Sequence, residues 1–143
     1  MTVEYFFAAL ALACIGAYFV WRNNFKVRQA NAAAALRAAF SPEISTLESP
    51  ARTGNVRDIL VSTFDRHSEA VTNFKWFLSK SSQRRFNQAW QQYHSGHEFD
   101  AEAWNIPIKE RLFMEYFSIH DQSEATKYAL KQIHNLLQFA KQP

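Results

Sequence analysis

The hydrophobic positions of this chain form one unbroken apolar run near the start, followed by several stripes at helical spacing. The run covers Val3 to Trp21, nineteen residues with one charge, Glu4, at its outer edge. A helix of this length is roughly 28 Å long, close to the hydrocarbon thickness of a bilayer. Aromatic residues, which favour the headgroup boundary, cluster at both ends of the run. The run predicts an N-terminal single transmembrane helix.

A cleaved signal, a lipoprotein and a soluble core helix are the alternatives for this run. A secretory signal needs Lys or Arg ahead of the apolar segment, whereas the leader here is MTVEY. A lipid on Cys14 would require a large aliphatic residue at Ala11, and the residues after Cys14 would turn polar, which they do not. We therefore expect residues 1–22 to remain as a transmembrane anchor.

The charges that flank the run predict its orientation. Arg22, Lys26 and Arg28 follow it, while the N-terminal side offers only the α-amine against Glu4. The positive-inside rule then places the C-terminal side in the cytoplasm and the N-terminus outside, in a single pass through the inner (plasma) membrane. The same three cations can contact anionic lipid heads, at about 1 kcal/mol each. Cys14 is the only cysteine, so no disulfide can form within the chain.

After the anchor, the chain continues without a helix breaker to Phe40, in an alanine-rich segment with strong helix propensity. The pattern predicts a juxtamembrane helix over residues 23–40. It is expected to stop near Ser41, because Pro42 disfavours a helical conformation in the residue before it. Residues 41–143 are then expected to form a cytoplasmic helical bundle that folds without the anchor.

Apolar spacings of three and four mark the helices of that bundle. The first stripe lies between Asn55, a predicted N-cap, and Ser79. Ser81 or Ser82 is expected to cap the next helix, and Asp121 with Glu124 forms a capping arrangement for the last. The four predicted stripes are Leu60, Thr63, Phe64, His67, Ala70, Val71, Phe74, Phe77 and Leu78; Phe86, Ala89, Trp90 and Tyr93; Ile108, Leu112, Phe113, Tyr116 and Phe117; and Ala125, Ala129, Ile133, Leu136, Leu137 and Ala140.

Only three glycines and four prolines interrupt the chain, and no strand pattern competes with these stripes. The predicted fold is therefore all-α, with a single transmembrane helix followed by a small bundle of about four helices. Three pieces of the sequence, AFSPE (39–43), HSEAVTNF (67–74) and RRFNQAWQQY (84–93), resemble a group of uncharacterised bacterial helical proteins. The resemblance covers roughly residues 37–94. It implies a helical fold and no assigned activity.

One segment carries residue types that bind metals. HSGHEFD (94–100) places His94 and His97 three residues apart, followed by Glu98. A zinc site needs three or four converging ligands, usually as H-E-x-x-H or with cysteines, and this order matches neither pattern. We therefore interpret the segment as a polar helix end, with His94 near the negative end of its helix. His67 lies on an apolar stripe, where a packed, hydrogen-bonded histidine is expected rather than a catalytic one.

The charge distribution argues against nucleic acid as a partner. All 16 Lys and Arg residues follow Trp21, as do 12 of the 13 acidic residues, so the soluble part carries only a small positive charge. A phosphate-binding stripe would be denser. Arg84 and Arg85 are interpreted as a solvated face, or as a contact with acidic lipids or a protein partner. Three scattered glycines exclude a glycine-rich phosphate loop, and no cofactor is expected.

Two functional classes, and a third drawing on the same anchor, remain open. The favoured one is a non-enzymatic interaction or adaptor module, tethered to the cytoplasmic face of a bacterial inner membrane. Its partners would be the lipid bilayer and either a membrane-associated protein or a second copy of the chain. The alternatives are a small metal-dependent hydrolase using His94, His97 and Glu98, and a membrane-perturbing effector.

Overall fold

A computed structural model of the chain describes residues 3–95, 112–117 and 119–141. Within those ranges there is no strand, so the predicted all-α fold is confirmed. The helices are α1 (Val3–Glu48), α2 (Val56–Lys75), α3 (Lys80–Ser95) and α5 (Gln122–Leu137), with the short 3-10 helices η2 (Met114–Phe117) and η3 (Gln138–Ala140).

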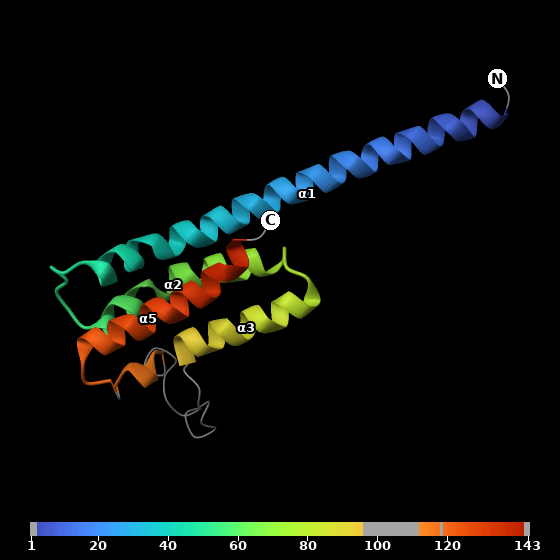
Figure 1. Ribbon diagram of the computed structural model, residues 1–143. Helices are drawn as coiled ribbons and strands as arrows, with labels where there is room; N and C mark the ends of the chain where they lie inside the picture. Colours follow the sequence, from blue (N-terminus) through green and yellow to red (C-terminus); the bar gives the residue numbers. More distant parts are fainter. Residues whose placement is uncertain (1–2, 96–111, 118, 142–143) are drawn as a thin grey trace.

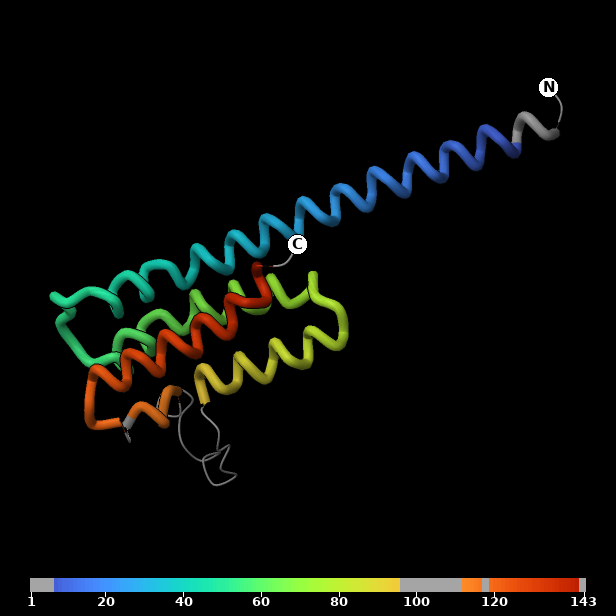
Figure 2. The backbone as a smooth tube through the Cα atoms, in the orientation of Figure 1, coloured from blue at the N-terminus to red at the C-terminus, as the bar shows by residue number. Residues whose placement is uncertain are grey.

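The four long helices form a bundle from which α1 projects (Figure 1). The second half of α1 packs against α2 and α5, and α5 also packs against α3. The first half of α1 extends beyond the other helices, as the tube in Figure 2 shows. The end of η3 returns to α1, where Arg37 Nη1 donates a 2.7 Å hydrogen bond to the carbonyl oxygen of Ala140. The inner half of α1 therefore packs along one side of the bundle, in contact with α2, α5 and η3.

The core contains many of the residues that the stripes predicted, and several others lie at its edge. Four members of the α2 stripe, including His67, are buried, and the predicted α5 stripe is buried throughout, with its last member in η3. On α3, Phe86 and Tyr93 are fully buried, while Ala89 and Trp90 pack at the edge. The largest side chains with less than 2% exposure are Tyr93, Phe40, Phe74, Phe86, Phe113, Leu36, Leu60, Ile133, Leu136, His67 and Val56. Ile108 of the third stripe lies outside the described residues.

The first helix does not end near Ser41, and that prediction is wrong. Helix α1 continues through Pro42 to Glu48, although proline removes one backbone hydrogen bond and crowds the preceding turn. Tertiary contacts offset this cost: Leu47 is buried, and Arg66 Nε of α2 donates to the carbonyl oxygen of Ala39 at 3.2 Å. Since Leu36 and Phe40 are also fully buried, a boundary at residue 41 cuts through the core.

The helix caps agree with the sequence at two of three sites. Asn55 Oδ1 accepts from the backbone N–H of Arg57 at 2.8 Å, and Asp121 Oδ1 accepts from the N–H of Ser123 at 2.8 Å. Helix α3 begins earlier than predicted. The helix already includes Ser81 and Ser82, so neither can be its N-cap. The cap is Ser79, whose Oγ accepts from the backbone N–H of Ser82 at 3.3 Å.

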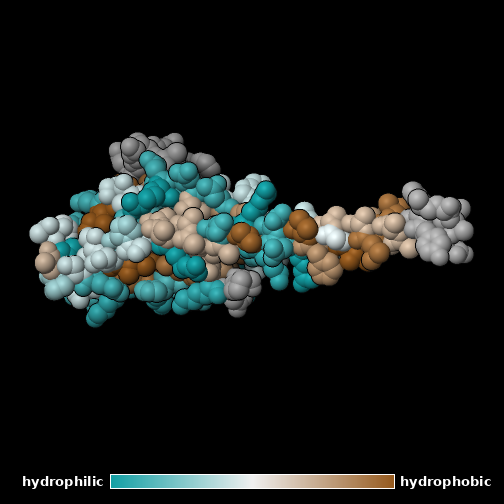
Figure 3. Space-filling view, turned by 90° about the horizontal axis from the view of Figure 1, so that it is seen from above, coloured by the Kyte–Doolittle hydropathy of each residue, from teal (hydrophilic) through white to brown (hydrophobic). Residues whose placement is uncertain are grey.

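The outer segment of α1, which we define as residues 7–28, is exposed along its whole length. Its apolar side chains form the brown projection at one end of the molecule in Figure 3, whereas polar side chains cover much of the bundle. Ten large apolar side chains of this segment are between 40% and 70% exposed: Phe7, Leu10, Leu12, Ile15, Tyr18, Phe19, Val20, Trp21, Phe25 and Val27. Searched over the described residues, none of the helices combines enough length and apolarity to cross a membrane.

We predict that a fragment of residues 23–143 folds and that a fragment of residues 41–143 does not. The shorter fragment lacks Leu36 and Phe40, and loss of one such core side chain typically costs about 2–5 kcal/mol. A domain of this size has only about 5–15 kcal/mol of total stability. Circular dichroism with urea unfolding measures both fragments. Cooperative unfolding of residues 41–143 would contradict the assignment of α1 to the core.

Candidate functional site

A buried polar network joins three helices at the centre of the bundle. His67 of α2 lies with Nε2 2.9 Å from Glu43 Oε2 of α1 and Nδ1 2.9 Å from the Tyr93 hydroxyl of α3. All three residues are at most 4% exposed. The ring of Phe40 stacks on the imidazole, with centroids 3.9 Å apart. Arg66, whose side chain is 48% exposed, forms a salt bridge to the other carboxylate oxygen of Glu43.

The protonation states of the network follow from burial. Burial lowers the pKa of His67 below its ordinary 6.5, although the hydrogen bond and the charge of Glu43 act in the opposite direction. Burial raises the pKa of the Tyr93 hydroxyl well above 10, so this group stays protonated. A neutral imidazole then donates from Nε2 to the Glu43 carboxylate and accepts at Nδ1 from Tyr93. The imidazole, the carboxylate and the Tyr93 hydroxyl of this network are therefore all hydrogen-bonded, and the charge of Glu43 is balanced by Arg66.

This network is structural in character, as expected for His67. A substrate would have to displace core side chains to reach the imidazole, which is fully buried. Its partners, Glu43 and Tyr93, were not assigned a polar role from the sequence. They lie 24 and 26 residues away from His67, and no local spacing pairs them. All three residues belong to the segments 39–43, 67–74 and 84–93, which carried the resemblance described above.

His94 differs from the polar helix end that its position suggested. It lies in the last turn of α3, but its ring is 4.9 Å from the ring of Trp90 and 5.7 Å from that of Phe64, centroid to centroid. Burial lowers the pKa of His94 to about 4. The imidazole is therefore neutral near pH 7, and the expected interaction of a charged histidine with the helix dipole is absent. Its carbonyl oxygen accepts from the N–H of Phe113 at 2.7 Å.

The structure does not test the alternative metal site of His94, His97 and Glu98. His97 and Glu98 lie outside the described residues, so the hydrolase alternative stays untested. In residues 3–95, 112–117 and 119–141, no three His, Cys, Asp or Glu side chains converge as a metal site would require.

The predicted surface residues lie in two places. Arg22, Lys26 and Arg28 are exposed on α1, between the apolar part of the outer segment and the bundle. Arg84 and Arg85 are exposed on α3, and only Arg85 lines a surface cleft described below. No protein-family profile, curated protein or solved structure matches this chain. Membership of the group that the sequence resembles stays a prediction.

We predict that His67→Leu lowers the free energy of unfolding by about 3–5 kcal/mol, because it leaves the buried Glu43 carboxylate and the Tyr93 hydroxyl without their shared partner. Urea unfolding followed by circular dichroism measures the loss. The matched control is His120→Leu at an exposed position, which should change stability by less than about 0.5 kcal/mol. If both variants were equally stable, the network would contribute nothing to the fold.

We also predict that the protein loses stability as the pH falls from 6.5 toward 4. In that window the unfolded state binds a proton that the half-buried His94 excludes, so protonation favours unfolding. His94 should account for about 1–3 kcal/mol of this loss. The lowered pKa of His67 acts with the same sign.

Denaturant midpoints measured across this pH range test whether His94 causes the loss of stability. His94→Phe keeps a ring among its aromatic neighbours and removes the titrating group, so it should flatten the profile. His120→Gln removes a histidine at an exposed site and is the matched control for the loss of one imidazole. A His94→Phe profile parallel to that of the unaltered protein would show that His94 does not titrate as its burial indicates.

Proposed function

We propose that this chain is a non-enzymatic helical interaction module, tethered to the cytoplasmic face of a bacterial inner membrane by the outer part of α1. The observation that carries the proposal is the exposed apolar surface of the outer segment, residues 7–28. It surrounds a helix that projects beyond the bundle (Figures 1 and 3). Phe25, at its inner end, contacts Phe77 of the bundle, while residues 7–24 are exposed throughout.

The size of this surface favours a lipid environment. Each large apolar side chain gains roughly 1.5–3 kcal/mol when it is fully removed from water. The ten exposed side chains together therefore represent a penalty comparable to the whole stability of a domain, about 5–15 kcal/mol. The apolar run in the sequence begins at Val3, ahead of the first described side chain, and extends to Trp21. A bilayer with a hydrocarbon core about 30 Å thick accepts a helix of that length.

Charge and aromatic residues support the orientation. Tyr18 and Trp21 have ring centroids 6.4 Å apart near the inner end of the apolar run, where amphipathic rings favour the headgroup boundary. Arg22, Lys26 and Arg28 follow immediately and are exposed. The positive-inside rule keeps such a cluster, and the bundle after it, in the cytoplasm.

Tethering supports a role in interaction rather than in chemistry. The histidine at the centre of the bundle is sealed in the core and paired with Glu43 and Tyr93. An anchor confines the bundle to a thin layer beneath the bilayer, which raises its effective concentration toward other membrane proteins. The partner of this proposal is a membrane-associated protein or a second copy of the chain.

We predict that a reporter active only in the cytoplasm, fused after Pro143, is active in bacterial cells. The reason is the one-sided cluster Arg22, Lys26 and Arg28. A reporter active only on the exported side, fused at the same position, should be silent. The reverse pattern would contradict the orientation.

A matched pair of variants tests the anchor itself. In a vesicle-flotation assay the full chain should float with the lipid, and Leu12→Lys with Ile15→Lys should prevent flotation. Two lysines near the centre of a membrane helix cost roughly 5 kcal/mol or more. The control, Asn23→Lys with Asn24→Lys, adds the same charge at exposed positions beyond the apolar run and should still float. Flotation of both variants would exclude insertion of α1.

A further inference from the structure

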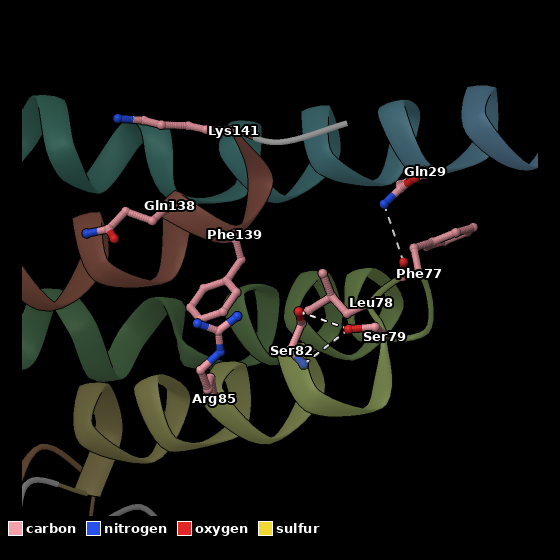
Figure 4. A pocket seen from close by; sticks show the side chains of 9 residues that line it. All are labelled: Gln29, Phe77, Leu78, Ser79, Ser82, Arg85, Gln138, Phe139 and Lys141. Atoms are coloured by element: carbon pink, nitrogen blue, oxygen red, sulfur yellow. Dashed lines mark hydrogen bonds between the residues drawn. The ribbon is translucent and has the colours of Figure 1, made fainter.

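A surface cleft lies where α1 meets the bundle (Figure 4). Its volume is about 540 Å³, and it opens between α1, the α2–α3 turn, the first turns of α3 and the C-terminal end of η3. Within the described part of the chain, its lining residues include two cations and no carboxylate. They are Gln29, Phe77, Leu78, Ser79, Ser82, Arg85, Gln138, Phe139 and Lys141.

The cations of the cleft are available for a ligand. Among the described residues, no hydrogen bond or ion pair engages the side chain of Arg85 or of Lys141. In Figure 4 the side chain of Arg85 points from α3 toward Phe139 of η3, while the side chain of Lys141 extends along α1, away from Ser79 and Ser82. The hydroxyls of Ser79 and Ser82, 3.0 Å apart, stand on the opposite side of the cleft. Ser79 donates its hydroxyl hydrogen to Ser82 Oγ, so Ser82 keeps its own hydroxyl hydrogen for a ligand. An arginine fork, a lysine and a hydroxyl are groups that bind phosphate oxygens.

The cleft faces the end of the bundle from which the outer segment leaves. Phe25 of α1 contacts Phe77 with ring centroids 5.7 Å apart, and Gln29 Nε2 donates to the carbonyl oxygen of Phe77 at 3.4 Å. Arg22 and Lys26 precede Gln29 by seven and three residues, so all three side chains share one face of α1. A row of positive charge therefore runs from the end of the apolar segment to the mouth of the cleft.

The position along α1 suits a lipid headgroup. Gln29 lies eight residues beyond Trp21, or about 12 Å along the helix axis. The headgroup layer on each side of a bilayer is about 5–8 Å thick, so long basic side chains at the cleft can reach its phosphates. Trp76, at the C-cap of α2 and next to Phe77, is 77% exposed. An exposed tryptophan at this end of the bundle is typical of a surface that contacts the membrane boundary.

We propose that this cleft binds the phosphate of an anionic lipid headgroup, with Arg85 as the main contact and Lys141 and the Ser82 hydroxyl as further donors. The proposal rests on the tethered orientation proposed above, because that orientation brings the cleft to the bilayer surface. Binding would give the bundle a second attachment and would fix the face that it turns toward the lipid.

Calorimetric titration of the full chain in neutral detergent micelles tests the cleft without requiring a bilayer. The probes are a short-chain phosphatidic acid, the matching phosphatidylcholine and inorganic phosphate. We expect one phosphatidic acid per chain, and a loss of affinity of about tenfold or more in Arg85→Gln, since a charge-assisted contact of the guanidinium is removed. Phosphatidylcholine and inorganic phosphate should bind much more weakly.

The neighbouring arginine provides a matched control. Arg84→Gln removes the same charge one residue before Arg85, at a position that does not line the cleft. This variant should bind phosphatidic acid as tightly as the unaltered chain. Lys141→Gln should weaken phosphatidic acid binding severalfold. Its matched control is Lys131→Gln, at an exposed position of α5 that does not line the cleft. Circular dichroism confirms that all four exposed substitutions leave the helices intact.

Three outcomes would overturn the proposal. Equal binding of inorganic phosphate would indicate a site for free phosphate, and equal loss in Arg84→Gln and Arg85→Gln would indicate attraction by net charge alone. Absence of phosphatidic acid binding would exclude the site altogether. Flotation of the full chain is measured separately, so failure of the cleft and failure of the anchor are distinguishable.

Discussion

The hydrogen bond between the His67 imidazole and the Glu43 carboxylate joins α2 to α1 inside the core of the molecule. Helix α1 passes the bundle on one side, and at this point its carboxylate enters the core and meets a ring from α2. Tyr93 completes the network from α3, so three helices are fixed in rotation and in register by one imidazole. A purely apolar interface would allow these helices to slide by a turn at small cost. Buried polar pairs forbid such slips, because each misalignment leaves a charge or a hydroxyl unpaired.

The same network explains how α1 tolerates a proline in its interior. Pro42 directly precedes Glu43, and Arg66 of α2 binds both the Glu43 carboxylate and the carbonyl oxygen of Ala39. Contacts made from outside the helix thus compensate at the turn that proline weakens. Helical stability in proteins comes mostly from tertiary packing rather than from local propensity, and α1 near Pro42 is such a case.

Periodicity predicted the bundle well, because the buried faces of α2, α3 and α5 repeat every three to four residues. It could not predict the end of α1, since the local rule for the residue before proline is overridden by partners 23 and 24 residues away in α2. His67 was correctly placed as a packed, hydrogen-bonded histidine, but its two partners were not identified. For His94, position in the helix suggested a solvated cap, whereas the aromatic rings of Phe64 and Trp90 set its environment. Phe113, whose φ of 59° lies in the left-handed region, is likewise held by burial and by its bond to His94, which no sequence rule anticipates.

The unbroken course of α1 has a mechanical consequence. All 46 residues form one helix, so no hinge separates the outer segment from the inner half that is locked into the core. In a chain anchored as proposed, the bundle cannot rotate independently of the membrane helix. The same face of the bundle therefore always follows the same face of that helix. One residue inserted between the two parts would turn the bundle by about 100°, because an α-helix has 3.6 residues per turn. Rotation of the outer segment about its axis within the bilayer would therefore rotate the whole bundle by the same angle.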